Sequence, residues 1–369
     1  MEQVKVLQIA VEVDVPAILW GPPGVGKTAT IQALGESLGL EVVTVIASLH
    51  EPSDFLGLPV PSGDRTRFLP PEWFLSLGER GKGLLFLDEI STAPPAVQAA
   101  ALRLVQERKI GSLALPSGVR IVLAANPPEL AAGGFELSPP LANRMAHIDW
   151  APPRVEDWAR GLVLGFPAPE FKPLNWEAQL PLAKGLIAGF LSSRSHLLLR
   201  LPEDPSQLGR AWPSPRSWEM ATRMLAGALA KDPEDRGLIA LAVGSVVGTG
   251  VGIEVAAFVA EGLIDPREAL KDPDKVSLPK RGDLVLALVA AVASVVTSAE
   301  EGVQDLWDRA WYLYDRIMTE SGQKDLVLIG AQPLYAFWRE RQKARKPLSL
   351  AKTQKILAKL GALLEQIGA

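Results

Sequence analysis

The residues that could carry chemistry begin with a glycine-rich loop, GPPGVGKT, at positions 21–28. It fits the phosphate-loop pattern G-x-x-x-x-G-K-S/T, with a short apolar run before it and a helical pattern after it. Glycines let the backbone curl until successive N–H groups point at phosphate oxygens, and the following helix adds its positive dipole end. The residues expected to hold a nucleotide are Gly21, Pro22, Pro23, Gly24, Val25, Gly26, Lys27, Thr28 and Ala29.

Two side chains of this loop have separate expected roles. Lys27 would reach the β and γ phosphates, and the Thr28 hydroxyl would bind Mg²⁺. A phosphate loop predicts binding only, because hydrolysis also needs a group that activates water. The alternative, a glycine turn that happens to precede a lysine, fits the flanking strand and helix patterns less well.

A pair of carboxylates, Asp88 and Glu89, follows the apolar run LLFL. Ligands in open α/β sheets bind at the carboxyl ends of the strands, which is where this pair is expected. We expect Asp88 to hold the Mg²⁺, usually through water, and Glu89 to polarise the attacking water. Taken alone, the dipeptide would ordinarily be two solvated acids at the end of a strand.

Three further polar residues complete the predicted site. Asn126 follows the apolar run IVLAA, and its amide could orient the attacking water and contact the γ-phosphate. Arg144, in SPPLANRM, is expected on a helix, and Arg216, in WPSPRSWEM, near the start of another. An arginine supplied by a neighbouring molecule raises the rate of phosphoryl transfer by roughly 10³ to 10⁵. Either arginine taken alone would more ordinarily form a surface ion pair.

The elements that must position these residues alternate between strand and helix over residues 1–150. Strand-like runs are PAILW, EVVTVIAS, KGLLFLDE, VRIVLAAN and HIDW, and helical patterns such as PPAVQAAALRLVQER lie between them. This alternation predicts an α/β fold, a phosphate-loop NTPase core with a parallel sheet and helices on both faces. Two stretches, at about 50–80 and 109–119, are too long for ordinary connections, and the second is expected to be a hairpin.

After residue 150 the pattern becomes helical and is interrupted repeatedly by proline. We expect residues 1–150 to form the nucleotide-binding core, 151–212 a linker or helical insertion, and 213–369 an all-α lid with an extended helical C-terminal region. The apolar stretch 237–253 is short for a membrane span and rich in glycine, so buried helices are expected there. No membrane span is predicted.

The composition excludes several classes of function. The 369 residues carry a net charge of −4, which does not support a chain-wide nucleic-acid surface. Cysteine is absent, and His50, His147 and His196 lack ligand spacing, so neither a disulfide nor a zinc site is expected. The first residues do not resemble a secretory signal, and a cytoplasmic protein is expected. A basic stretch at 338–360 is expected to be a solvated helical face with Ile356, Leu357 and Leu360 turned inward, although it could also bind nucleic acid or an acidic partner.

The motifs GPPGVGKT, LLFLDEI, AANPPE, SPPLANRM and SPRSWE occur in an order and at intervals that resemble AAA+ ATPases, specifically the MoxR-like, helix-2-insert branch. The resemblance implies that residues 21–28 are the Walker A loop and that Asp88 and Glu89 are Walker B. It also implies that Asn126 is sensor 1, Arg144 an arginine finger directed at a neighbour's nucleotide, and Arg216 sensor 2. The stretches 50–80 and 109–119 stand where this branch carries an insert and a hairpin that face the pore or axial surface of a ring.

The resemblance fades over about the last 130 residues, and two features depart from the plainest members. The segment 160–210 is long, and the helical region after Arg216 exceeds a minimal lid. Either departure could decide whether Arg216 reaches the nucleotide of its own subunit or that of a neighbour.

The function implied by the resemblance is an ATPase that uses ATP and Mg²⁺ at subunit interfaces of a ring, expected to be a hexamer. Members act as chaperone-like remodelling motors on protein clients, often beside a partner with a von Willebrand A domain. Two alternatives stay open: a nucleic-acid-associated NTPase motor, and a nucleotide-gated scaffold that hydrolyses only to reset. Nucleic acid is the less favoured partner, and the sequence decides neither the client nor the choice between ATP and GTP.

Overall fold

The computed structural model describes residues 2–127, 134–166, 169, 171–262, 264–354 and 356–357. The chain forms two compact units, Met1–Asn175 with Leu199–Ile253, and Trp176–Leu198 with Glu254–Ala369. It therefore passes between the units at residues 175, 198 and 253. The division into domains at 1–150, 151–212 and 213–369, which was expected from the sequence, stays a prediction.

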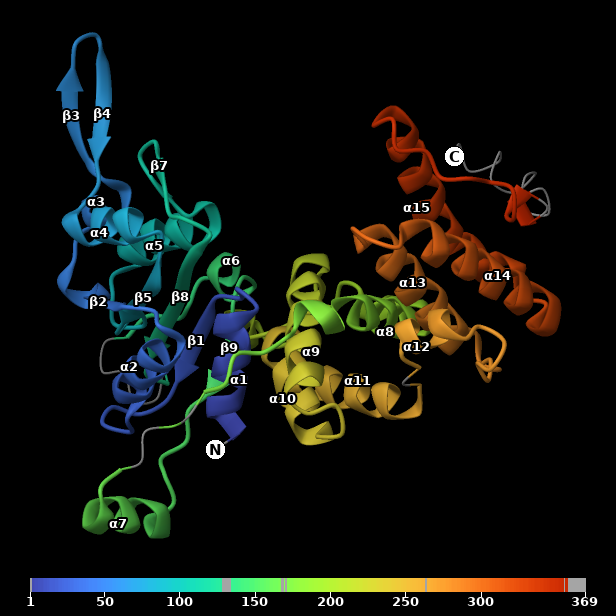
Figure 1. Cartoon of the computed structure of the whole chain (residues 1–369). Coiled ribbons are helices and arrows are strands. Elements are labelled where there is room, and N and C mark those ends of the chain that lie inside the picture. The colour runs from blue at the N-terminus through green and yellow to red at the C-terminus, as the bar shows by residue number, and fades with distance from the viewer. Residues whose placement is uncertain are drawn as a thin grey trace. The chain divides into compact units, whose positions relative to one another are not determined.

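The first unit is built on a five-stranded parallel sheet in the order β2-β5-β8-β1-β9 (Figure 1). Its strands are β1 (Ala17–Trp20), β2 (Val42–Ile46), β5 (Lys82–Asp88), β8 (Gly118–Ala125) and β9 (Ala146–Asp149). The three central strands are continuous apolar runs and are buried over most of their length, as parallel strands covered on both faces must be. The predicted α/β fold with a parallel sheet is confirmed.

The register brings the carboxyl ends of the strands to one edge of the sheet. Trp20, the last residue of β1, lies opposite Ala125 of β8 and Asp149 of β9. Asp88, the last residue of β5, lies opposite Ile46 of β2. The phosphate loop 21–28, the pair Asp88–Glu89 and Asn126 therefore all follow strands at this edge, which we call the loop edge.

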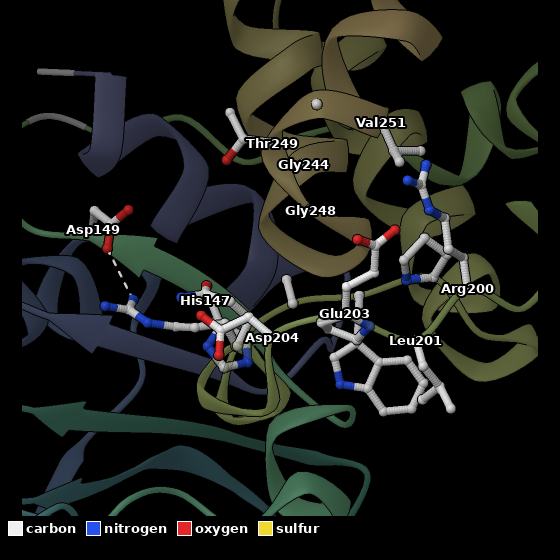
Figure 2. A pocket seen from close by; sticks show the side chains of 17 residues that line it. His147, Asp149, Arg200, Leu201, Glu203, Asp204, Gly244, Gly248, Thr249 and Val251 are labelled. Atoms are coloured by element: carbon white, nitrogen blue, oxygen red, sulfur yellow. Dashed lines mark hydrogen bonds and ion pairs between the residues drawn. The ribbon is translucent and has the colours of Figure 1, made fainter.

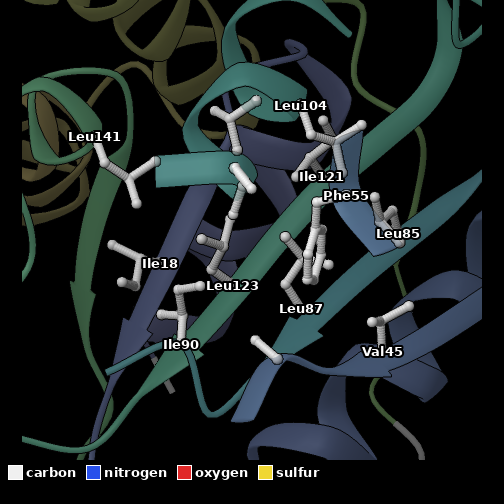
Figure 3. Packing of buried hydrophobic residues seen from close by; sticks show 14 of the residues in the cluster. Ile18, Val45, Phe55, Leu85, Leu87, Ile90, Leu104, Ile121, Leu123 and Leu141 are labelled. Carbon is white, nitrogen blue, oxygen red and sulfur yellow. The ribbon is translucent and has the colours of Figure 1, made fainter. Parts of the chain in front are cut away.

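Helices of the first unit cover both faces of the sheet. They are α1 (Glu2–Glu12), α2 (Lys27–Leu38), α3 (Pro52–Leu56), α4 (Glu72–Arg80), α5 (Pro95–Glu107) and α6 (Pro139–Ala142). Figure 3 shows one layer of this packing, in which Phe55 of α3 and Leu104 of α5 lie against Leu85 and Leu123 of the strands. Burying one such side chain contributes roughly 1.5–3 kcal/mol. The alternate strand residues, such as Phe86, are also buried, and α1 and α2 contact the strands.

Two hairpins project from this core. Residues 50–80 contain β3 (Leu58–Ser62) paired antiparallel with β4 (Arg65–Leu69), and the expected hairpin at 109–119 is present as β6 (Lys109–Ile110) and β7 (Leu113–Ala114). The hairpins touch at Gly111, whose φ is 58°. A Cβ there would lie 2.9 Å from the Phe68 carbonyl oxygen, so this contact requires glycine.

The remaining helices of the first unit are α7 (Val155–Leu164), α9 (Pro215–Lys231) and α10 (Arg236–Val247), and the chain leaves the unit within α11 (Thr249–Glu261). Helix α1 contacts both α9 and α10. The apolar stretch 237–253 forms most of α10, which is largely buried as expected, and the start of α11, where Thr249, Gly250 and Ile253 are exposed. Among the described residues, no helix is long and apolar enough to cross a membrane.

The regular elements of the second unit, in its described part, are all helices. It contains α8 (Leu180–Ser193), α12 (Pro266–Lys271), α13 (Gly282–Ser298), α14 (Val303–Ser321) and α15 (Lys324–Lys343). Trp307, Trp311 and Tyr314 of α14 form the centre of its core. In the basic stretch, Ile356 is buried in this core and Leu357 packs against it, as predicted, whereas Leu360 lies outside the described residues.

Candidate functional site

The phosphate loop joins β1 to α2, which begins at Lys27. Gly24 and Gly26 have φ angles of 78° and 86°, in the left-handed region that favours glycine, and a Cβ on either would meet no atom within 4 Å. Gly21 is required for a different reason, because a Cβ there would lie 2.5 Å from the carbonyl oxygen of Trp150. Two glycines therefore shape the loop, and the third lets it pass beside β9.

Lys27 lies inside the loop and is only 8% exposed. Its Nζ donates hydrogen bonds to the carbonyl oxygens of Gly21 at 2.6 Å and Pro22 at 3.0 Å, and lies 3.5 Å from Oδ1 of Asn126. Burial lowers the pKa of Lys27, while the charge of Asp88 acts in the opposite direction. The ammonium group is thus held at the centre of the predicted site.

Asp88 and Thr28, the two predicted Mg²⁺ ligands, are neighbours. Oδ1 of Asp88 accepts a hydrogen bond from the Glu89 N–H at 2.8 Å. Burial raises the pKa of Asp88 and the charge of Glu89 raises it further, whereas the Glu89 N–H, Lys27 and the Thr28 hydroxyl favour its charged form. Hydroxyl and carboxylate oxygens suit Mg²⁺, which usually takes its other ligands from phosphate and water. Within the described residues, no group of three or more His, Cys, Asp or Glu side chains could hold a metal ion.

Glu89 has an unusual backbone and a partner that the sequence did not indicate. Its φ is 56°, which is rare for a residue with a side chain and is often found at functional sites. One carboxylate oxygen, Oε2, accepts a hydrogen bond from Ser48 Oγ at 2.6 Å. Ser48 lies in the turn after β2, at the loop edge, and a short polar residue two positions beyond a strand was its only sequence signal.

Asn126 follows β8, the strand between β1 and β5. It therefore lies between the phosphate loop and the Asp88–Glu89 pair. Its backbone N–H donates to Ser91 Oγ at 3.1 Å, which fixes the turn that carries the amide. Lys27, Thr28, Asp88, Glu89 and Asn126 thus form one group at the loop edge.

Arg144 does not belong to this group. It comes two residues before β9, whose first residue, Ala146, lies opposite Ala17 at the start of β1. Arg144 is therefore at the opposite edge of the sheet from the phosphate loop, roughly 10 Å or more away at a rise of about 3.3 Å per residue. Arg144 was expected on a helix, but α6 ends at Ala142, because the chain turns at Asn143 to enter β9.

Arg216 lies in the first turn of α9 and near Arg144. Burial lowers the pKa of Arg144 and the charge of Arg216 lowers it further, so the two guanidinium groups are within electrostatic reach. Ser214, the N-cap of α9, is hydrogen-bonded to Asn143 beside Arg144. The structure therefore brings the two predicted arginines to each other, as an arginine pair, and not to Lys27.

His147, in β9, connects the strand before the phosphate loop to the end of α6 near Arg144. Its Nδ1 accepts from Trp20 Nε1 at 3.0 Å, and its Nε2 lies 2.9 Å from the Ala142 carbonyl oxygen, to which it donates. Burial lowers the pKa of His147 to about 4, so the ring is neutral near pH 7. Trp20 stacks on this ring and is part of the core.

A cavity of about 760 Å³ lies between β9, the segment 200–213 and the turn between α10 and α11 (Figure 2). Arg210 donates to Asp149 at 3.0 Å on its wall, and the same guanidinium lies 4.2 Å from the centre of the Trp20 ring. Residues of the phosphate loop do not line this cavity. The cavity nevertheless reaches the loop edge at Asp149, which lies opposite Trp20.

Comparison with known proteins finds a family match for the part of the chain that contains most of these residues. Residues 16–145 match the family described as AAA domain, dynein-related subfamily. This range covers the loop edge and Arg144 but not Arg216. Residues 16–145 are thus similar to an AAA domain.

Two solved structures are similar at low identity. A "putative ATPase" from Cytophaga hutchinsonii is 17% identical, with 75% of this chain and 89% of that chain covered and a TM-score of 0.45. NtrX from Brucella abortus is also 17% identical, with 63% of this chain and 52% of that chain covered and a TM-score of 0.29.

Proposed function

We propose that this protein hydrolyses ATP at sites shared between neighbouring copies of the chain. The observation that supports this most directly is the separation of its functional residues into two groups. Lys27, Thr28 and Asp88 lie at the loop edge, whereas Arg144 and Arg216 lie together at the opposite edge. A single copy would thus carry the residues that hold a triphosphate at one edge and the arginines that stabilise its transition state at the other.

The nucleotide would be ATP with Mg²⁺. The backbone N–H groups of the phosphate loop and Lys27 would bind the phosphates, and Thr28 and Asp88 would hold the Mg²⁺. The metal, when bound, neutralises charge that develops on the β and γ phosphates. Burial of Asp88 and Lys27 strengthens these interactions by excluding water.

Hydrolysis would depend on Glu89 and Asn126. The Glu89 carboxylate would accept a proton from the attacking water, and the Asn126 amide would orient that water toward the γ-phosphate. Ser48 donates to one carboxylate oxygen of Glu89 and leaves the other available for water. Ser48 is therefore a positioning residue for the proposed base.

Arg144 and Arg216 would both act on the nucleotide of the neighbouring copy. Their common location supports one shared target, because the charge of Arg216 reaches Arg144. This assignment makes Arg216 a residue that acts in trans, which the sequence left open. The negative charge of the neighbour's γ-phosphate would offset the repulsion between the two guanidinium groups.

The wider role that we propose is that of a MoxR-like remodelling motor. It would form a ring, expected to be a hexamer, and act on a protein client or on a partner with a von Willebrand A domain. The hairpins β3–β4 and β6–β7, which meet at Gly111, would face the pore or axial surface of the ring. These roles rest on the resemblance of the motifs to that branch.

Substitution of Glu89 by Gln tests the proposed activity. Loss of the general base should lower the ATPase rate by at least about 10²-fold, while ATP affinity changes little. A coupled phosphate-release assay and a fluorescent-nucleotide titration measure the two quantities, with Glu79→Gln, an exposed glutamate on α4, as the matched control. A Glu89→Gln protein that hydrolyses ATP at the normal rate would disprove the assignment.

The same variant separates a motor from a nucleotide-gated scaffold. A scaffold should capture its partner with a non-hydrolysable ATP analogue and hold it unchanged. A motor should alter the partner only during continued turnover. Proteins that co-purify with Glu89→Gln but not with the control would identify the client.

A further inference from the structure

Three buried polar side chains lie where α6 meets the start of α9. Asn143, Ser214 and Ser217 are 5%, 6% and 0% exposed. Burying a polar group costs free energy unless it is hydrogen-bonded, so such a cluster must be internally satisfied. Each of these side chains has partners within the cluster.

The hydrogen bonds tie the turn after α6 to the first turn of α9. Ser214 Oγ donates to Asn143 Oδ1 at 2.7 Å, and Asn143 Nδ2 donates to the Trp212 carbonyl oxygen at 3.1 Å. Ser214 Oγ also accepts from the Ser217 N–H at 3.1 Å, which caps α9. Ser217 Oγ donates to the same Trp212 carbonyl at 2.9 Å.

The two arginines are neighbours of this cluster in the chain. Arg144 directly follows Asn143, and Arg216 stands between Ser214 and Ser217. Arg144 donates to the Pro140 carbonyl oxygen of its own turn. Among the ion pairs of the described residues, neither guanidinium is paired with a carboxylate, and the charge of Arg216 disfavours the charged form of Arg144.

We propose that the Asn143–Ser214 hydrogen bond holds Arg144 and Arg216 side by side, so that they bind one phosphate group of the neighbouring subunit as a unit. The inference rests on the proposed function, since the phosphate is the γ-phosphate of the neighbour's ATP. Asn143 and Ser214 are positioning residues, because they act through the arginines and do not touch the nucleotide. Any shift of α9 is passed to Arg144 through this bond.

Substitutions of Asn143 and Ser214 test the proposal by steady-state ATPase measurements. Asn143→Ala and Ser214→Ala should lower kcat by about 10- to 100-fold, the scale expected when a catalytic group is misplaced by about 1 Å. KM for ATP should change less than about twofold, because the loop edge is intact. Ser214→Thr keeps the hydroxyl and should restore most of the rate.

A matched control removes a helix cap elsewhere in the same unit. Asp235 caps α10 by accepting from the Leu238 N–H at 2.9 Å, so Asp235→Ala should cost similar stability to Ser214→Ala. Melting temperatures check that match, and kcat of Asp235→Ala should stay normal. An equal fall of kcat in Asp235→Ala and Ser214→Ala would overturn the proposal, because general destabilisation would then explain both.

A double-mutant cycle tests whether the two arginines act as a unit. In an Arg216→Ala background, Asn143→Ala should lower kcat by less than about a further threefold, because the bond then positions only one arginine. Fully multiplicative losses would contradict the proposal.

Mixed assemblies distinguish this inference from the proposed function itself. Glu89→Gln subunits keep their arginines, so adding them to Asn143→Ala subunits should raise the ATPase rate above that of Asn143→Ala alone. Absence of that rise would place the effect of Asn143 within its own subunit and overturn the inference, whereas wild-type protein without any ATPase activity would instead overturn the proposed function.

Discussion

The loop edge and the arginine pair are held in place in different ways. At the loop edge, Asp88 ends one strand of a parallel sheet and Lys27 and Asn126 follow two others, so the register of that sheet sets their spacing. The arginine pair depends on a hydrogen bond between side chains 71 residues apart, Asn143 and Ser214. The first arrangement is built into the sheet, whereas the second depends on how α9 docks.

This difference has a functional meaning. The phosphate loop is anchored by β1 at one end and by α2 at the other, so its geometry does not depend on how α9 docks. A pair of charges held by a few hydrogen bonds of one side chain, Asn143, can be assembled or disrupted when an element moves. In the proposed reaction, the loop edge would therefore be the constant part and the arginine pair the adjustable part.

Substitution of Arg144 by Ala should have the largest effect, because it should separate the ATPase rate from nucleotide affinity. The ATPase rate should fall by about 10³-fold, because transition-state charge loses its partner, while nucleotide affinity is retained. Turnover and nucleotide titration check this, with Arg103→Ala, a surface residue paired to Glu107, as the control. A large loss of nucleotide affinity would show that Arg144 belongs to its own subunit's loop edge after all.

His147 allows a test of how firmly the two regions are joined, because it contacts Trp20 on one side and Ala142 on the other. Its pKa is lowered from 6.5 to about 4, so the neutral ring stabilises the fold fully above pH 6.5 and loses this contribution as the pH falls toward 4. The free energy of unfolding should decrease by about 3 kcal/mol over that range through this group.

The measurement compares urea unfolding of the wild type and His147→Gln at neutral and acidic pH. The variant should show a weaker pH dependence, and titration of the ring by NMR is practical because the chain has only three histidines. A His147 that titrates near 6.5 would mean that the connection between the two regions opens readily.

Ser48→Ala should have the smallest effect of the three. Removing the hydroxyl frees the Glu89 carboxylate, and kcat should fall by about tenfold with little change in KM for ATP. Ser48→Thr should retain most of the rate, and Ser53→Ala, on the nearby α3, serves as a control. An unchanged rate in Ser48→Ala would show that the strained backbone of Glu89 is sufficient to position it.

The sequence predicted the sheet and the loop edge because both are encoded locally. Apolar runs with polar residues at their ends specify parallel strands and the turns after them, and the phosphate-loop pattern is contained in eight consecutive residues, 21–28. Asp88, Glu89 and Asn126 were predicted by the same logic, since the ends of parallel strands meet at one edge.

The remaining features depend on contacts between residues far apart in the chain. Ser48 is 41 positions from Glu89, and Ser214 is 71 from Asn143, and no local pattern marks either pair. His147 was set aside for lack of metal-ligand spacing, although its two ring nitrogens join Trp20 to Ala142. Such roles follow from tertiary packing, so they become visible only when the fold is known.

The location of the phosphate loop and of Arg144 at opposite edges of one sheet has a consequence for assembly. Consider an interface that joins the edge carrying the arginine pair of one copy to the loop edge of the next. Such an interface unites two different surfaces and repeats head to tail. In an open row of copies, the last loop edge always lacks arginines, and only closure of the row supplies them. The rate per subunit should therefore rise with protein concentration and level off when the row closes.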